Sequence, residues 1–234
     1  MTKIPVLLFS GGIDSYVAYH WLQKPRTVYF DLGSRYSARE ITVIQDLIPE
    51  TIIDRSLSVG NREIGEKAYI PFRNLMLACL AEKYGQDIYI IGIEDDVVSD
   101  KNESIFSEFS NLLSKLEGKT VNVSSPFWAF SKVEIISWYL QQGLPKETLY
   151  ETISCYSADE KSNYCGACPS CFRKWVAFVL SDLPLPFHNV PLAIEYYQAA
   201  KNRAYTEKRC KNIIQAVETF LLNGTSSFVV GEPT

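Results

Sequence analysis

The sequence predicts an α/β fold in which a parallel sheet carries helices on both faces. Short apolar segments alternate with segments of helical periodicity over the first 150 residues, which is the pattern of right-handed βαβ units. The chain has 234 residues and is 47% hydrophobic, enough for one sizeable core with an added region. After residue 150 a cysteine-rich loop and further helical segments replace the alternation. We therefore expect an α/β domain over 1–150 and a cysteine-containing helical region over 151–234 packed on it.

Five segments have the apolar character of strands that are buried in a parallel sheet. The first reads IPVLLF and tolerates Pro5 because that proline stands near its start. The clearest strand signal is DIYIIGI. The expected strands cover 4–9, 27–31, 51–55, 87–93 and the extended stretch 120–126.

Helical segments follow these strands along the chain. The strongly apolar helix over 72–85 ends at Gly85, and the segment SKVEIISWYLQQG also ends in a glycine. The expected helices cover 14–24, 36–47, 72–85, 104–116, 131–143 and 171–181. After a proline-rich connector over 184–192, we expect one long amphipathic helix over 191–222 and a loose tail.

Charge and hydropathy exclude several classes of protein. The formal net charge of −4 argues against wholesale binding to a nucleic-acid backbone. The start of the chain lacks the apolar stretch and cleavage site of a signal peptide. No apolar run reaches the roughly 18 residues of a membrane span. We expect a soluble, cytoplasmic protein without a membrane partner.

The first expected strand stops abruptly at a small polar loop, S-G-G-I-D-S, at residues 10–15. Ligands of open parallel sheets bind beyond the carboxyl ends of the strands, so this loop lies at the expected binding edge. Gly11 and Gly12 let the backbone turn and leave N–H groups that can bind an anion at the start of the next helix. Asp14 fits such a site when Mg²⁺ lies between its carboxylate and phosphate groups. The alternative is a tight turn with a Ser or Asp helix cap.

A cluster of cysteines predicts a metal site. Four of the six cysteines fall within 17 positions, and neither of the two histidines lies among them. Zn²⁺ takes four such ligands in a tetrahedron, and a closed four-thiolate site is structural. An iron–sulfur cluster, a C-x-x-C redox pair and unliganded buried thiols are the alternatives. The expected ligands are Cys155, Cys165, Cys168 and Cys171.

The S-G-G-x-D-S loop resembles the PP-loop of the N-type ATP pyrophosphatases, and it lacks the lysine of a Walker A motif. That superfamily has a Rossmann-like parallel sheet. It splits ATP between the α and β phosphates and transfers AMP to a carboxyl or carbonyl oxygen. The resemblance implies that ATP binds at this loop together with Mg²⁺.

Further segments resemble the 7-cyano-7-deazaguanine synthase family of the queuosine pathway, with a PP-loop near the N-terminus and four late cysteines. FDLGSRYSARE at 30–40 is similar to its F-D-Y-G-Q-R-H-x-x-E segment, and YIPFRN at 69–74 is similar to Y-V-P-x-R-N. SKVEI at 131–135 matches S-K-x-E-I, and SCY followed by YCGACPSC matches the cysteine segment. The chain therefore looks like a divergent member of that family.

The resemblance implies a ligase that forms carbon–nitrogen bonds. Its reaction converts 7-carboxy-7-deazaguanine into the nitrile with ammonia and ATP, through an acyl adenylate and an amide. Nucleotide products are AMP or ADP-level, with release of pyrophosphate or phosphate. The resemblance also implies a homodimer. Its small-molecule partners would be ATP and a 7-deazaguanine. A protein amine stays open as a further acceptor.

The resemblance also assigns site residues. Catalytic candidates are Ser10, Asp14, Ser15, Lys132 and Arg73. Candidates for nucleotide binding are Phe9, Ser10, Gly11, Gly12, Ile13, Asp14, Ser15, Asp31, Arg73, Asn74 and Gly92. For Arg73 and Lys132, a solvated surface charge is the alternative interpretation.

Two departures from the family concern the second substrate. The family carries Y-P-D-C-R-x-x-F after its fourth strand, where this chain has Ser104, Ile105 and Phe106 in place of Asp, Cys and Arg. The family's histidine before the second cysteine is Tyr164 here. Three other functions therefore stay open: joining a deazaguanine acid to an amine other than ammonia, modification of tRNA by a PP-loop enzyme, and nucleotide binding without catalysis.

Overall fold

The structure is a computed structural model, and its centre is a five-stranded parallel sheet with the strand order β3-β2-β1-β4-β5. It describes residues 4–65, 69–94, 96, 99–153, 155, 164–166, 168–184 and 193–222. The strands are β1 (Pro5–Leu8), β2 (Arg26–Phe30), β3 (Ile52–Asp54), β4 (Asp87–Tyr89) and β5 (Asn122–Ser124). All five expected strands are present, and the predicted α/β class is confirmed.

Helices connect the strands and extend the fold beyond them. Before β5 they are α1 (Ile13–Trp21), α2 (Ser37–Leu47), the 3₁₀ helix η1 (Gly60–Arg62), α3 (Arg73–Ala81) and α4 (Glu103–Glu117). After β5 they are α5 (Lys132–Gln141), α6 (Thr148–Glu151), α7 (Pro169–Leu180), α8 (Ala193–Lys201) and α9 (Glu207–Leu222). None of the helices in the described ranges has both the length and the apolar character of a membrane span.

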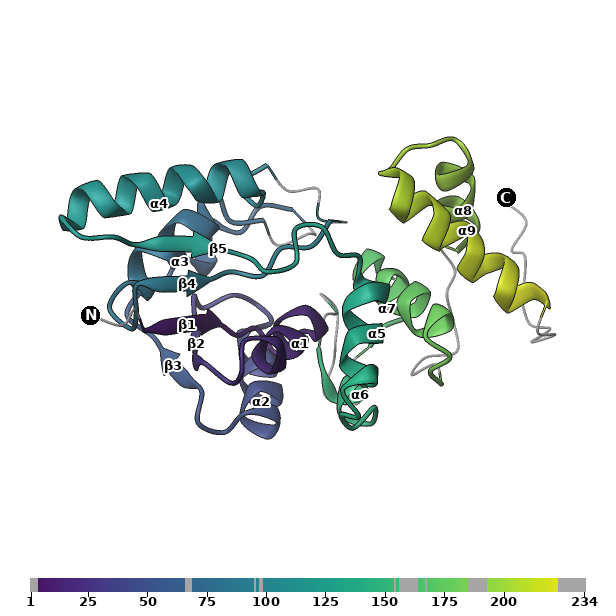
Figure 1. The fold of residues 1–234 in the computed structure, drawn as a ribbon, viewed down its shortest axis with the longest axis horizontal. Coiled ribbons are helices and arrows are strands. Elements are labelled where there is room, and N and C mark those ends of the chain that lie inside the picture. The colour runs from purple at the N-terminus through teal and green to yellow at the C-terminus, as the bar shows by residue number, and fades with distance from the viewer. Residues whose placement is uncertain are drawn as a thin grey trace.

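Alternate strand residues enter two separate cores, because successive side chains of a strand point to opposite faces of the sheet. In β1, Val6 packs with residues of α3 and α4, whereas Leu7 packs with residues of α1, α2 and α5. In β2, Val28 belongs to the same core as Val6, and Tyr29 belongs to the same core as Leu7. The sheet is thus covered by helices on both faces (Figure 1). Ligands of such sheets bind beyond the carboxyl ends of the strands.

A third core joins α7 to α8 and α9, which lie beyond α7 and away from the sheet in Figure 1. It contains Phe172 and Trp175 of α7 together with Ile213 and Val217 of α9. Lys208 of α9 adds polar contacts to α5 and to the segment before it, because its Nζ donates to the Glu134 carboxylate at 3.0 Å and to the Ala129 carbonyl at 2.9 Å. The C-terminal helices therefore form a fixed part of the fold.

The expectation of one helix over 191–222 was wrong, because the chain turns between α8 and α9. Arg203 has a φ of +56°, a left-handed conformation that ends α8, and the Ala204 N–H donates to the Ala199 carbonyl at 3.0 Å. α9 then begins after Thr206, whose Oγ1 accepts from the Arg209 N–H at 3.3 Å. Thr206 followed by Glu207 is an N-terminal helix signal that could have revealed the break.

Smaller differences concern the ends of elements. β4 stops at Tyr89, four residues earlier than expected, and α3 stops at Ala81 instead of continuing to Gly85. The short helices η1 and α6 were not expected from the sequence. Most of the proline-rich connector (185–192) and the tail (223–234) lie outside the described residues.

Phe106 of α4 offers a test of the core on the α3–α4 face. Its side chain is 1% exposed and contacts the rings of Phe109 and Trp128. Phe106→Ala should lower the free energy of unfolding by about 3–5 kcal/mol, because it removes a buried ring and leaves a cavity. Urea denaturation measures this change. Leu116→Ala on the same helix is the control, since Leu116 is 71% exposed and its truncation should cost less than about 0.5 kcal/mol. Equal losses would contradict the assigned packing.

Candidate active site and metal centre

A cavity of about 300 Å³ lies at the carboxyl ends of the strands, beside the ends of the neighbouring strands β1 and β4. Its lining includes Phe9 after β1 and Ile91 after β4. In open α/β sheets, ligands bind beyond the ends of two neighbouring strands at the point where the strand order reverses. β1 and β4 are such a pair, so the cavity lies at the expected position. Nine of the candidate site residues line it: Phe9, Ser10, Gly12, Ile13, Asp14, Ser15, Arg73, Asn74 and Lys132.

The S-G-G-I-D-S loop forms one wall of this cavity and leads directly into α1. Gly11 has a φ of +71°, which favours glycine. Ser15 Oγ donates to the Gly12 carbonyl at 3.0 Å and lies 3.3 Å from Ser10 Oγ, so both hydroxyls stay at the rim. The helix N-cap is Gly12, without a side-chain hydrogen bond. The alternative interpretation, a Ser or Asp cap, is thus wrong, and the first N–H groups of α1 have no capping side chain.

Lys132 forms an ion pair with Asp14 at the cavity wall, beside the loop. Lys132 is the first residue of α5, where Ser131 and Glu134 form a reciprocal capping box. This cap fixes the start of the helix, and the lysine beside it is only 9% exposed. The interpretation of Lys132 as a solvated surface charge is therefore wrong, because its ammonium group lies in the cavity wall next to the loop.

The opposite wall carries Arg73 and Asn74 at the start of α3. Phe72 precedes them with a φ of +59°, a conformation that is costly for a bulky residue and that directs the chain into the helix. Arg73 donates to the Tyr36 hydroxyl at 3.5 Å, and Asn74 donates to Asp100 at 3.0 Å. Arg73 therefore pairs with a residue that also lines the cavity, and Asn74 is buried with its amide group hydrogen-bonded.

Glu40 of α2 is a cavity residue that the sequence reasoning did not single out. Its carboxylate accepts a hydrogen bond of 2.6 Å from the Tyr29 hydroxyl. Burial raises the pKa of Glu40 to about 7, although the hydrogen bond from Tyr29 and the charge of Arg73 act in the other direction. Glu40 could have been recognised as a candidate site residue from the sequence, because it is the last residue of the matched segment FDLGSRYSARE.

Asp96 and two cations complete the polar lining. Its carboxylate lies 2.8 Å from Lys101 Nζ and 3.0 Å from an Arg173 nitrogen. Burial alone would raise the pKa of Asp96, but these two positive charges lower it below its usual range. Arg173 comes from α7, so the helix after the cysteine cluster also contributes to the cavity.

Three of the candidate nucleotide-binding residues do not line the cavity. Gly11 is part of the loop but not of the cavity lining, and its carbonyl accepts a hydrogen bond from the Ile153 N–H at 2.8 Å. Asp31 forms an ion pair of 3.2 Å with Arg55. Gly92 packs against Trp128 so closely that an added Cβ would lie 2.1 Å from the indole ring. A direct role of these residues in nucleotide binding stays a prediction.

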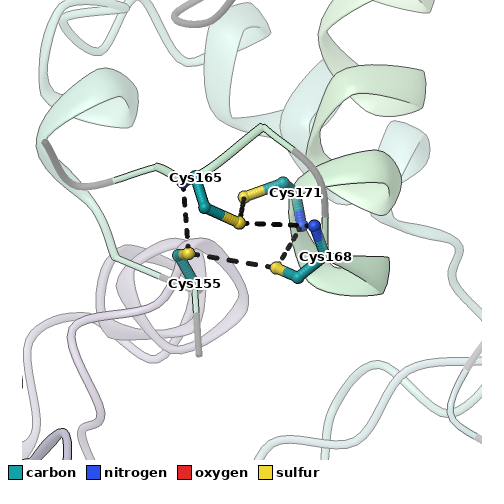
Figure 2. Close-up of side chains that lie close together, drawn as sticks. All are labelled: Cys155, Cys165, Cys168 and Cys171. Carbon is teal, nitrogen blue, oxygen red and sulfur yellow. Dashed lines mark hydrogen bonds between the residues drawn. The ribbon is translucent and has the colours of Figure 1, made fainter. Parts of the chain in front are cut away.

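The four clustered cysteines converge in the structure. Their sulfur atoms all lie within 4.8 Å of one another, and two of the sulfur pairs are 3.9 Å apart. Figure 2 shows the four sulfurs turned toward one another. Cys168 is the N-cap of α7, and its Sγ accepts from the Cys171 N–H at 3.4 Å. Backbone N–H groups of Cys165 and Cys168 also donate to sulfur atoms of the cluster at 3.3 Å.

This arrangement could hold a metal ion and fits zinc. Four sulfurs at about 2.3 Å from one ion in a tetrahedron lie about 3.8 Å from one another, close to the distances observed here. Each N–H donor to sulfur favours the thiolate form, which is the form that binds metal. An iron–sulfur cluster would place its ligands on separate irons and would require wider spacing. The cysteines are not joined by disulfides.

Replacement of Cys171 tests the metal centre. Cys171→Ser should reduce the metal content of the purified protein from one ion per chain to near none, because a closed site needs all four thiolates. Elemental analysis by mass spectrometry gives this ratio and the identity of the ion. Cys210→Ser is the control, since Cys210 is also buried but lies outside the cluster. Full metal content in Cys171→Ser would contradict the assignment.

Glu40 predicts a pH dependence of stability. Below about pH 4.5 this carboxyl is protonated in both the folded and the unfolded chain. As the pH rises toward 7, the unfolded chain releases the proton first, so the free energy of unfolding falls by roughly 3 kcal/mol. Glu40→Gln should remove this decrease. Urea denaturation of both proteins between pH 4.5 and 8 measures it, and parallel pH profiles would contradict the assigned environment of Glu40.

Comparisons with known proteins agree with this geometry. The family model described as Queuosine biosynthesis protein QueC matches residues 35–181, and α8 and α9 lie beyond the end of this match. The 7-cyano-7-deazaguanine synthase of Methanobrevibacter smithii is 24% identical, over 80% of this chain and 97% of the relative. The enzyme of the same name from Methanosphaerula palustris is 28% identical, over 78% of this chain and 98% of the relative. The chain belongs to the queuosine biosynthesis QueC family.

Proposed function

We propose that this protein is an ATP-dependent ligase that activates the carboxylate of 7-carboxy-7-deazaguanine and forms a carbon–nitrogen bond with ammonia. The main support is the S-G-G-I-D-S loop, which lies with Lys132 at one wall of a cavity of ligand size. The relatives named 7-cyano-7-deazaguanine synthase support the choice of substrate. The family match begins after the loop, so the loop geometry is an independent argument.

The loop and the start of α1 bind the phosphates of ATP in this proposal. The uncapped N–H groups of the helix donate hydrogen bonds to phosphate oxygen, and the hydroxyls of Ser10 and Ser15 can join them by turning their protons away from their present partners. Lys132 supplies a positive charge at the same wall, and Arg173 supplies another. Asp14 would hold Mg²⁺, which favours oxygen ligands and neutralises phosphate charge when bound.

The reaction then follows from the positions of these groups. The substrate carboxylate attacks the α-phosphorus, the bond to the β-phosphate oxygen breaks, and pyrophosphate leaves. Lys132 and Arg173 stabilise the negative charge that develops on the leaving group. Ammonia displaces AMP from the acyl adenylate and loses a proton to give the amide. A second ATP activates the amide oxygen in the same way, and loss of AMP and of two N–H protons gives the nitrile.

The wall with Glu40 and Arg73 is the proposed site of the deazaguanine ring. Glu40 can accept hydrogen bonds from ring and exocyclic N–H groups when it is ionised, and Arg73 can donate to the exocyclic carbonyl oxygen of the base. Ser104 is exposed and Phe106 is buried in the α3–α4 core. These residues therefore do not replace the family's anchors, and a different amine acceptor is the main variant of this proposal.

The other functions have less support. Thiolation of tRNA needs a reactive cysteine near the nucleotide, but no cysteine lines the cavity within the described ranges. A module that only binds nucleotide would not need the Asp14–Lys132 pair beside the loop. We also propose that residues 1–150 form the catalytic domain. Residues 151–234 carry the zinc and helical region, although Ala177 and Phe178 of α7 pack into the main core.

Incubation with ATP, Mg²⁺, ammonia and 7-carboxy-7-deazaguanine tests the proposed function. We expect AMP, pyrophosphate and a product that mass spectrometry identifies as the amide or the nitrile. Lys132→Met should lower turnover by about 10²–10³-fold, because it removes a charge that stabilises the leaving group. Lys115→Met on the exposed face of α4 is the matched control and should leave turnover unchanged. Absence of AMP and of any new product from the unaltered protein would refute the proposal.

A further inference from the structure

Lys174 is a buried lysine that the proposed reaction does not use. It lies on α7 between the four-cysteine cluster and the cavity, and its side chain is only 1% exposed. Lysine is almost never buried without polar partners, because its nitrogen loses its hydrogen bonds to water. The partners of Lys174 therefore show what this position requires.

Those partners belong to two segments that meet beside α7. Lys174 Nζ donates to the backbone carbonyl and to the Oγ1 of Thr152, both at 2.8 Å, and also donates to the Tyr164 hydroxyl. The Tyr164 hydroxyl in turn lies 2.5 Å from the Tyr150 carbonyl and 2.6 Å from the Thr152 carbonyl, and its one proton is shared between these two acceptors. Thr152 is fully buried, so water cannot reach its carbonyl and hydroxyl oxygens to replace the hydrogen bonds from Lys174 and Tyr164.

Each of the two segments leads to one of the sites. Tyr164 is the residue directly before Cys165 of the metal centre. Thr152 is directly before Ile153, which lines the cavity and donates its N–H to the Gly11 carbonyl of the nucleotide loop at 2.8 Å. The Ile153 side chain also lies beside Gly11, since a Cβ added to this glycine would lie 3.4 Å from the isoleucine methyl group. A continuous set of contacts thus runs from the cysteines to the loop.

We propose that Lys174 is a positioning residue that couples the four-cysteine centre to the S-G-G-I-D-S loop. By holding Tyr164 and Thr152 together, it keeps Ile153 in place behind Gly11 and so keeps the loop in the shape that binds phosphate. The inference deepens the proposed function, on which its nucleotide-binding part rests. The metal centre then has a role in ordering the nucleotide site in addition to stabilising the C-terminal region.

Lys174→Met tests this role, because methionine has a similar length but no N–H donors. We expect the variant to retain one metal ion per chain by elemental analysis. Its affinity for a non-hydrolysable ATP analogue with Mg²⁺, measured by calorimetry, should fall at least tenfold. Hydrogen exchange of a peptide over residues 7–15, read by mass spectrometry, should become at least tenfold faster in the loop.

Three further variants separate positioning from general stability. Val217→Ala truncates a buried residue of α9 in the core that α7 shares, away from these contacts, and should leave nucleotide affinity and loop exchange unchanged at a temperature where it is folded. Tyr164→Phe and Thr152→Val each remove a hydroxyl partner and should change both readouts in the same direction as Lys174→Met. They also provide the test if the methionine variant does not fold.

The outcomes separate the two proposals. Wild-type affinity and wild-type loop exchange in Lys174→Met, or equal changes in Val217→Ala, would overturn the positioning role. If the unaltered protein binds no ATP analogue, the proposed function fails. The exchange of the loop still decides whether Lys174 couples the two segments, because that readout needs no nucleotide.

Discussion

The ion pair between Asp14 and Lys132 is the contact on which the candidate site depends, since it joins two helices across 118 residues of sequence. The parallel order of the strands places the starts of α1 and α5 at the same edge of the sheet. A lysine that is largely removed from water needs an opposite charge nearby, and Asp14 supplies it. The pair therefore fixes a positive charge beside the loop, where phosphate groups would bind.

α7 links the two chemical centres of the molecule. Its N-cap Cys168 and its residue Cys171 belong to the four-cysteine cluster, while Ser170 and Arg173 of the same helix line the cavity. Residues three or four apart share one face of a helix, so neighbouring residues of one short helix can serve two sites. The cluster and the cavity consequently share a rigid element, and distortion of one should reach the other.

Local signals in the sequence were sufficient for most of the fold and for half of the site. Apolar runs located the five strands, and the close spacing of the cysteines predicted a cluster whose sulfurs do converge. The loop at 10–15 was recognisable because two glycines interrupt an apolar strand at its end. These features depend on neighbouring residues only, so no tertiary information was required.

The remaining features depend on contacts between distant segments. The pKa of Glu40 is raised by burial that only the folded chain creates, and Asp96 meets Arg173 across 77 residues. The break between α8 and α9 lacks a glycine or proline, so periodicity alone suggested one continuous helix. The close packing of Gly92 against Trp128, which leaves no room for a side chain, likewise depends on the folded chain.

The helical pair α8–α9 has a consequence for the size of the smallest stable chain. Phe172 and Trp175 are at most 1% exposed, and the ring of Phe172 stacks on Tyr196 of α8 while Trp175 contacts Phe220 of α9. A chain shortened to the family-matched region would present these aromatic rings to water next to the cysteines. In this protein α8 and α9 cover hydrophobic surface that α7 would otherwise expose, so the fold depends on residues beyond the family match.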